Sequence, residues 1–317
     1  GLALDSHTVK VVVKSGTLKV DALYALGEST QADENALVSV ETTFPDSYAV
    51  VQGQTINGLP ETVQVKTGTG SVVTKPVIWS NNTAEHFTAA YETTSVTGVV
   101  QEGVNSFGAK LSITIPVEVV PKNVVYYIDM VKGTPDENAA TESFAAIKAL
   151  RGGALLNQAA DQLKTDSNTW GLVDTDAGTK GYTDTKDKTA TGIYGANNAS
   201  GETLSYRLTL EPGTYTITSA HREWWGMTRP MKLTVTVDDI DLDAGTIQVD
   251  SSNTTVQNSY SFSVGRKQTI TYTITATGTQ APVVSWLAVC RTGEAQEQEP
   301  YDSIPGITGS VIRATNG

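Results

Sequence analysis

The stretch LSYRLTLEPGTYTITSA, residues 204–220, decides how this chain folds. Apolar and polar residues alternate on both sides of Pro212 and Gly213. Alternation with a period of two is the pattern of a half-buried β-strand. A Pro-Gly pair between two such runs is typical of a tight turn. The sequence therefore predicts two strands joined by a sharp change of direction.

The same strand signal recurs along most of the chain. Short runs separated by Gly, Pro and Asn occupy 37–44, 47–54, 62–67, 75–80, 86–100, 110–120 and 124–131 before this stretch, and 231–238, 246–251, 259–265, 268–277 and 282–290 after it. Helix-forming composition is confined to 136–153 and 154–163, which are rich in Ala and Leu. We expect a mostly β chain of tandem β-sandwich modules, with one short helical insert.

Shifts in composition divide the chain into four parts. Residues 1–35 are expected to be the last hairpin of a preceding β-domain plus a linker, since the run ESTQADENA, residues 28–36, is polar. Residues 36–121 are expected to form a first β-sandwich, and residues 122–291 a second one. Residues 292–317 are acidic and contain Pro, which indicates a linker or the truncated start of another module.

The first sandwich resembles the bacterial immunoglobulin-like domains that lie between modules of large secreted glycan-degrading enzymes. The residues that carry the resemblance are LPETVQVKTGTG (59–70), KPVIWS (75–80), HFTAAYETTSVTGVV (86–100) and IPVEVVP (115–121). The resemblance implies an immunoglobulin-like sandwich with Trp79 as its buried tryptophan. It also implies that this part of the chain is a spacer.

The second sandwich resembles malectin-like and related galactose-binding-like carbohydrate-binding modules. TLSYRLTLEPGTYTITSAHREWW (203–225) is similar to that family's aromatic strand, Gly-Thr-Tyr hairpin and strand end, and VYYIDM (125–130) resembles its first strand. His221 and Glu223 stand at the His and Glu of the family's strand end, whereas Arg222 replaces Phe-Ala between them. The resemblance implies a jelly-roll fold whose ligand-facing aromatic residues come partly from just after this strand end.

The stretch HREWWGMTRP, residues 221–230, concentrates the side chains that carbohydrate recognition needs. A neutral sugar has an apolar ring face, which stacks on an aromatic ring, and a rim of hydroxyls, which bond to charged or amide side chains. The candidates are Trp224 and Trp225 for stacking, and His221, Arg222, Glu223 and Arg229 for hydrogen bonds. Neighbours on a strand point to opposite faces, so we expect one tryptophan exposed and one in the core, unless the strand ends before them. The alternative is that both pack in the core or at a hinge.

Two further aromatic residues are candidates for ligand contact. Trp170 lies in DSNTWGLVD, among polar and turn residues, which predicts a loop; the alternative is packing at a sheet edge. Tyr194 lies between Gly192 and Gly195 and is followed by two asparagines, so we expect a second aromatic platform there. Trp286 stands in an apolar run and is expected to be core.

One acidic stretch has the spacing of a calcium loop. In DDIDLDAGTIQVD, residues 238–250, Asp239, Asp241 and Asp243 are two residues apart. Ala244 stands where such a loop has glycine, and strands flank it, so a solvated hairpin end explains the acids as well. Apart from this calcium candidate we expect no cofactor, because no group of Cys and His has the spacing of a zinc site.

The composition restricts the partners. The 317 residues carry a formal net charge of −12, which disfavours nucleic acid and anionic membrane surfaces. No run approaches the roughly 20 apolar residues of a membrane-spanning helix. The single cysteine, Cys290, leaves no internal disulfide and is expected to be inert core. The chain starts within a strand-like pattern and without a signal peptide, as expected of a fragment or a mature form.

These features predict non-catalytic carbohydrate-binding and spacer modules of a secreted, multimodular bacterial protein. We expect it outside the cell or attached to its surface, with a neutral polysaccharide or glycoprotein glycan as partner. The alternative is a structural or adhesive surface segment without a ligand site of its own. The acidic residues include no pair in a recognisable catalytic setting, and no G-x-S-x-G motif is present. The two family resemblances imply that a glycoside hydrolase domain lies elsewhere in the full protein.

Overall fold

A computed structural model describes residues 34–130, 146–147, 149–150, 162–180, 188–252 and 254–294. Contacts between residues divide the chain into two compact units: Gly1–Thr43 with Leu59–Ser80 and Thr97–Ile113, and Phe44–Gly58 with Asn81–Val96 and Thr114–Gly317. The hairpin expected in residues 1–35 and the linker expected in 292–317 lie outside the described residues, apart from 34–35 and 292–294. The four-part division of the chain stays a prediction.

The first six strands form one sheet, in the order β1-β3-β4-β5-β6-β2. They are β1 (Leu37–Val40), β2 (Tyr48–Val51), β3 (Thr62–Thr67), β4 (Val72–Ser80), β5 (Thr93–Val100) and β6 (Ser112–Val120). The β1–β3, β3–β4 and β4–β5 pairs are antiparallel, whereas β2 runs parallel to β6. The sequence alternation explains the burial, since Val63 and Val65 of β3 are buried and Gln64 between them is exposed.

Two features of this sheet differ from the sequence-based expectation. The strand expected over 86–100 begins only at Thr93, because Tyr91 has a φ of 71°, in the left-handed region that a strand does not contain. Trp79 is half-buried rather than fully buried, and its indole N–H donates to the carbonyl oxygen of Pro60 at 2.8 Å.

Twelve further strands in the described part form three sheets. They are β7 (Val124–Asp129), β8 (Trp170–Leu172), β9 (Gly178–Lys180), β10 (Gly192–Tyr194), β11 (Thr203–Leu210), β12 (Gly213–Arg222), β13 (Arg229–Val237), β14 (Ile240–Val249), β15 (Thr255–Val264), β16 (Gln268–Ala276), β17 (Val283–Val284) and β18 (Trp286–Gly293). The five-stranded sheet has the order β14-β13-β16-β11-β8, the four-stranded sheet β15-β12-β18-β7, and the three-stranded sheet β17-β10-β9.

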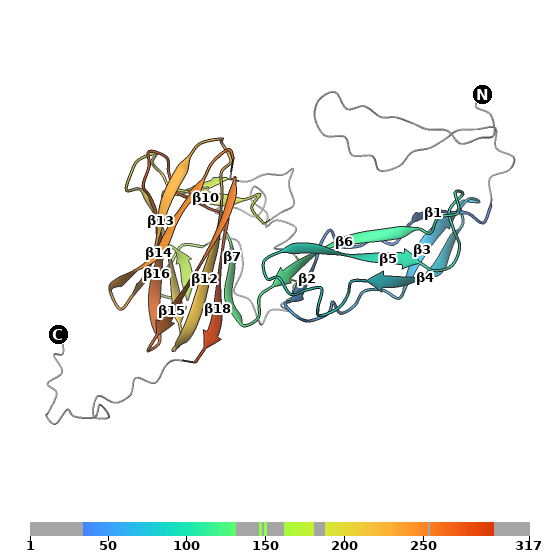
Figure 1. The fold of residues 1–317 in the computed structure, drawn as a ribbon, viewed down its shortest axis with the longest axis horizontal. Helices are drawn as coiled ribbons and strands as arrows, with labels where there is room; N and C mark the ends of the chain where they lie inside the picture. The colour runs from blue at the N-terminus through green and yellow to red at the C-terminus, as the bar shows by residue number, and fades with distance from the viewer. Residues whose placement is uncertain are drawn as a thin grey trace. The chain divides into compact units, whose positions relative to one another are not determined.

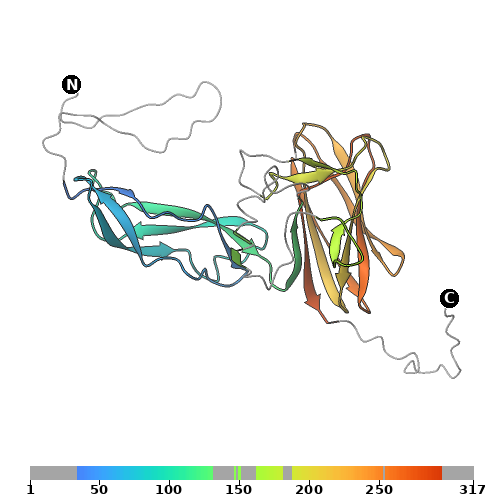
Figure 2. The same ribbon diagram turned by 180° about the vertical axis from the view of Figure 1, so that it is seen from behind.

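The five-stranded and four-stranded sheets form the two layers of a sandwich (Figures 1 and 2). One hydrophobic core lies between them, to which Tyr206 and Leu233 contribute from the first sheet and Tyr215 and Leu287 from the second. The strand β10 lies at one end of the layers, near the start of β13 (Figure 1). The prediction of a mostly β chain is confirmed.

The stretch 204–220 joins the two layers. β11 pairs with β16 and β8 in the five-stranded sheet, whereas β12 pairs with β15 and β18 in the four-stranded sheet. The two predicted strands are confirmed, and the turn between them is a crossing from one layer to the other. The hairpin that the resemblance implied here is wrong, because β11 and β12 do not pair with each other and belong to different sheets.

Only part of the expected helical insert is described. Residues 146, 147, 149 and 150 are helical, and most of the remainder lies outside the described residues. Leu163, at the end of the expected insert, instead forms an isolated β-bridge with Leu172. Within the described ranges, no helix is long and apolar enough to cross a membrane.

Candidate functional site

The candidate site lies in the loop that follows β12. This strand ends at Arg222, and β13 begins at Arg229. Gly226 between them has a φ of 73°, a conformation that favours glycine and lets the chain reverse. The strand therefore ends before Trp224 and Trp225, and strand alternation does not fix the directions of their side chains.

The two tryptophans have different environments. Trp225 is 40% exposed, whereas Trp224 is half-buried and packs against the core of the sandwich. The indole N–H of Trp224 donates to the carbonyl oxygen of Thr189 at 3.2 Å. Its ring lies so close to Gly192 that a Cβ there would be 2.2 Å from a ring carbon, which explains the glycine. Trp224 is thus a fixed support, and its ring meets that of Trp225 edge-on at a centroid distance of 5.6 Å.

A buried ion pair holds the loop. The carboxylate of Glu223 accepts a hydrogen bond from Nε of Arg229, and the two side chains are 0% and 5% exposed. The second carboxylate oxygen of Glu223 accepts the backbone N–H of Trp225 at 2.6 Å. Nη1 of Arg229 donates to the carbonyl oxygen of Ala281 at 2.7 Å, and the guanidinium carbon lies 4.9 Å from the Trp225 ring centroid. The pair fixes the backbone and the ring of Trp225, and its two charges compensate each other.

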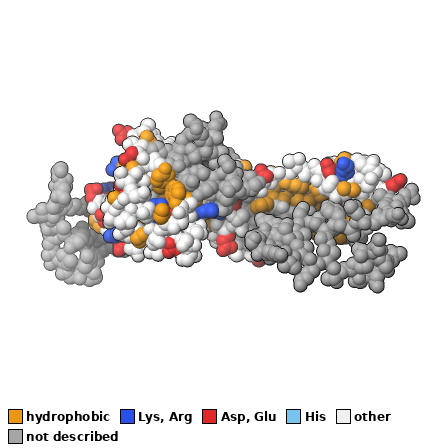
Figure 3. Space-filling model, turned by 90° about the horizontal axis from the view of Figure 1, so that it is seen from above, with side chains coloured by type: hydrophobic (Ala, Val, Ile, Leu, Met, Phe, Trp, Pro, Cys, Tyr) orange, Lys and Arg blue, Asp and Glu red, His pale blue; other side chains and the backbone are white. Residues whose placement is uncertain are grey.

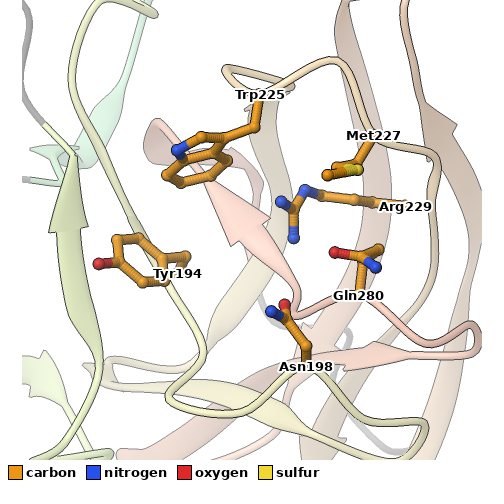
Figure 4. A pocket seen from close by; sticks show the side chains of 6 residues that line it. All are labelled: Tyr194, Asn198, Trp225, Met227, Arg229 and Gln280. Carbon is orange, nitrogen blue, oxygen red and sulfur yellow. The ribbon is translucent and has the colours of Figure 1, made fainter.

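An open cavity of about 310 Å³ lies beside Trp225. Six residues line it: Tyr194, Asn198, Trp225, Met227, Arg229 and Gln280. Figure 4 shows the two aromatic rings on one side and the polar ends of Arg229, Gln280 and Asn198 on the other. Seen from above, this end of the sandwich gathers hydrophobic side chains among polar ones (Figure 3).

Tyr194 and Trp225 form a corner. Their ring centroids are 5.2 Å apart, and the ring planes meet at 80°. Tyr194 ends β10, which pairs with β9 and β17. A Cβ at Gly178 of β9 would lie 2.2 Å from the Tyr194 ring, so glycine is required there as well. The Tyr194 ring is therefore held by close packing against Gly178, and the Trp225 ring by Trp224 and Arg229.

His221 does not reach the cavity, because it is 0% exposed. Its Nδ1 lies 2.6 Å from the carbonyl oxygen of Val283, which only accepts, so Nδ1 carries the proton. Its Nε2 then accepts from the hydroxyl of Ser219 at 2.8 Å, and that oxygen lies 2.7 Å from the hydroxyl of Tyr272. Burial lowers the pKa of His221 to about 4, so the ring is neutral near pH 7.

Two more predicted site residues lie away from the cavity. Trp170, expected in a loop, begins β8 and is 5% exposed in the core of the sandwich. Arg222 is half-buried and donates from Nη1 to the hydroxyl of Thr189 at 3.2 Å. Of the eight predicted residues, the structure brings Tyr194, Trp225 and Arg229 to the cavity.

Three lining residues were not among the predicted ones: Asn198, Met227 and Gln280. Asn198 is one of the two asparagines after Tyr194, and Met227 lies within HREWWGMTRP, so both had a local signal. Gln280 lies in the loop before β17, some fifty residues further along the chain from Met227. Only the fold brings it to the same cavity.

The acids of the calcium candidate make hydrogen bonds within their hairpin. Asp241 accepts from the hydroxyl of Thr236 at 2.7 Å, and Asp243 accepts the backbone N–H of Gly245 at 2.9 Å. Asp239 lies in the turn before β14 with a φ of 62°. In the described part of the chain, no group of three or more His, Cys, Asp or Glu residues could hold a metal ion.

No known protein family and no curated protein matches this chain. Among solved structures, it is similar to a family 35 carbohydrate-binding module from Clostridium thermocellum, with 16% identity and a TM-score of 0.28 over 38% of this chain and 90% of the module. It is similar to a carbohydrate-binding module of Cellvibrio mixtus lichenase 5A in complex with cellotriose, with 18% identity and a TM-score of 0.26 over 37% and 88%. It is also similar to Bacteroides uniformis β-glucuronidase 2, with 10% identity and a TM-score of 0.34 over 82% and 30%. At these identities and TM-scores, the function has to be argued from the site.

Proposed function

We propose that the cavity beside Trp225 binds a sugar residue of a neutral glycan. The observation that carries the proposal is the corner formed by Tyr194 and Trp225, with polar side chains opposite it. An exposed ring offers a stacking surface to the C–H face of a pyranose. Arg229, Asn198 and Gln280 supply donors, and the two amides also supply acceptors, for the hydroxyls at the rim of the sugar.

The size of the cavity supports a small occupant. Ligand sites of proteins span about 300–1,000 Å³, and this cavity, at about 310 Å³, is at the lower end. It therefore fits one sugar ring better than several consecutive residues of a chain. The rest of the glycan would leave through the open side.

The charges support a neutral ligand. Arg229 is the charged residue of the lining, and the buried carboxylate of Glu223 compensates it. An anionic sugar would have to compete with that carboxylate for the guanidinium, and the formal net charge of −12 would repel it further.

In this proposal the chain is a binding and spacer segment of a larger secreted protein that acts on glycans. The six-stranded sheet is then the spacer of immunoglobulin-like type, and the sandwich is the binding module.

A screen of the intact chain against a panel of glycans, followed by calorimetry, tests the proposal. Trp225→Ala is expected to weaken binding about 30-fold, which corresponds to the roughly 2 kcal/mol of a binding hot spot. Tyr194→Ala is also expected to weaken glycan binding. Phe107→Ala is the matched control, because Phe107 is an exposed aromatic residue (66%) of the other unit. Absence of binding by the wild type, or equal binding by Trp225→Ala, would favour a structural or adhesive segment instead.

A further inference from the structure

A second buried ion pair joins Glu118 to Lys188, which is close in sequence to the residues that contact Trp224. Lys188 and Glu118 are 6% and 1% exposed, and Nζ of Lys188 donates to the Glu118 carboxylate. The hydroxyl of Thr93 donates to the other carboxylate oxygen at 2.6 Å and accepts from Nζ at 3.3 Å. Charges are costly to bury unless they are paired with good geometry. This three-residue cluster therefore holds Lys188 in one position.

Lys188 begins the described segment that leads to the cavity. The next residue, Thr189, accepts the indole N–H of Trp224 with its carbonyl oxygen and Nη1 of Arg222 with its hydroxyl. Gly192, four residues after Lys188, lies directly against the ring of Trp224. One short segment thus connects the ion pair to the tryptophan that supports Trp225.

A further bond fixes the middle of this segment. The hydroxyl of Thr191 donates to the carboxylate of Asp129 at 3.0 Å, and both residues are buried. Asp129 ends β7 of the four-stranded sheet. The segment is therefore attached at two points. Thr191 bonds to the sandwich, and Lys188, at the start of the segment, bonds to Glu118 of β6.

We propose that Glu118 and Lys188 are positioning residues for the carbohydrate site. They touch no residue of the cavity lining in the bonds described above, and they act by holding Thr189 where its carbonyl oxygen fixes Trp224. Glu118 belongs to β6 of the six-stranded sheet but to the same compact unit as the cavity. This part of the sheet is then more than a spacer, because it sets the affinity of a site that it does not line. The expected effect on glycan affinity rests on the proposed function, whereas the positioning of Trp224 does not.

The first readout needs no carbohydrate. In a ¹⁵N-labelled intact chain, the indole N–H signals of the five tryptophans are followed by NMR, and Trp224→Phe assigns the signal of Trp224. Glu118→Gln keeps the shape of the side chain and removes its charge, and we expect it to shift the signals of Trp224 and Trp225. The indole signal of Trp79, whose N–H bonds to Pro60 in the other unit, is expected to stay in place.

The second readout is the affinity for the glycan found in the panel. We expect Glu118→Gln and Lys188→Met to weaken binding about tenfold, the size of a long-range coupling. The matched control is Glu102→Gln, which breaks the exposed ion pair with Lys75 and is expected to change neither readout. Val65→Ala, which opens a cavity in the core of the other unit, controls for lost stability alone.

The outcomes separate the two proposals. A folded Glu118→Gln variant with unchanged indole signals and unchanged affinity would overturn the positioning role. A wild type that binds no glycan would overturn the proposed function, while the indole signals would still decide whether the ion pair positions Trp224. If Glu118→Gln does not fold, Glu118→Asp keeps the charge at a shorter reach, and a shift of the Trp224 signal without a shift at Trp79 is again the expected result.

Discussion

Two aromatic clusters of the same unit have similar ring contacts, but their central tryptophans differ in exposure. The core cluster is Tyr91, Tyr127 and Trp286, and the cavity cluster is Tyr194, Trp224 and Trp225. In the core cluster, the ring of Trp286 lies 5.1 Å from that of Tyr91 and 5.5 Å from that of Tyr127, and Trp286 is 0% exposed. In the cavity cluster, Trp225 has neighbours at 5.2 and 5.6 Å and is still 40% exposed.

The surroundings explain the difference. The core cluster packs with small or aliphatic residues such as Ala220, Ala288 and Ile147, which close over the rings and exclude water. The cavity cluster has the Glu223–Arg229 pair beneath Trp225 and amide side chains opposite it. This side is open to solvent, since both Trp225 and Asn198 are exposed. Ring contacts alone therefore do not tell a core from a binding platform, whereas the exposure of the central tryptophan does.

The largest expected effect comes from removing a ring of the core cluster. Trp286→Ala is expected to lower the free energy of unfolding by about 3–5 kcal/mol, because it leaves a large cavity in a closed shell. Denaturant unfolding followed by circular dichroism measures it. The fraction that remains folded should keep its affinity for the glycan. A loss of affinity at unchanged stability would contradict the division between the two clusters.

Acid is expected to lower the free energy of unfolding through His221. This histidine bonds to Val283, which pairs with Tyr194 of the cavity cluster. The pKa of His221 is lowered from 6.5 to about 4 in the folded state. The unfolded chain therefore binds the proton first. Above pH 6.5, His221 is neutral in both states and costs no stability. As the pH drops towards 4, its protonation in the unfolded chain lowers the free energy of unfolding by about 3 kcal/mol, and below pH 4 this group causes no further change.

Unfolding free energies of the wild type and of His221→Gln, measured between pH 8 and pH 4, test this pH dependence. The difference between the two curves isolates the histidine from the carboxylates, which titrate in both proteins. A difference that stays constant over the whole range would show that His221 is not the group responsible.

A conservative change at the ion pair beneath Trp225 comes next. Arg229→Lys keeps the charge but cannot bond both to Glu223 and to the carbonyl oxygen of Ala281 in the same geometry. We expect a loss of roughly 2 kcal/mol in unfolding free energy together with weaker glycan binding, measured by denaturation and calorimetry. The exposed pair between Arg266 and Asp238 is the control, and Arg266→Lys should change neither quantity. If Arg229→Lys binds the glycan with the affinity of the wild type, the two-pronged geometry of the guanidinium is not needed to hold Trp225.

Local patterns predicted most of the fold. The run TVQVKT coincides with β3, and the apolar run around Trp286 correctly indicated core. The three-residue strands β8, β9 and β10 were missed, since a strand of that length shows no periodicity. Trp170 was placed in a loop because polar and turn residues flank it. It instead begins β8, the edge strand of the five-stranded sheet, and is buried, which fits the alternative of packing at a sheet edge.

The sequence predicted only those residues of the candidate site that stand out in a short stretch of the chain. Trp225 and Arg229 stand in one short stretch with an unusual density of charge, and Tyr194 stood out between two glycines. The burial of His221 and the arrival of Gln280 depend on pairings between distant strands, which no local pattern encodes.

The smallest effect on stability is expected from Trp225→Ala. About two-fifths of this side chain is exposed, and its loss leaves the Glu223–Arg229 pair and Trp224 in place. We expect a change of about 1 kcal/mol or less in the free energy of unfolding, against the much larger loss for Trp286→Ala. Denaturant unfolding of both variants under the same conditions measures the ratio. If Trp225→Ala costs as much as Trp286→Ala, Trp225 is a part of the core in spite of its exposure. A small cost together with lost glycan binding means that the ring is kept for the ligand rather than for the fold.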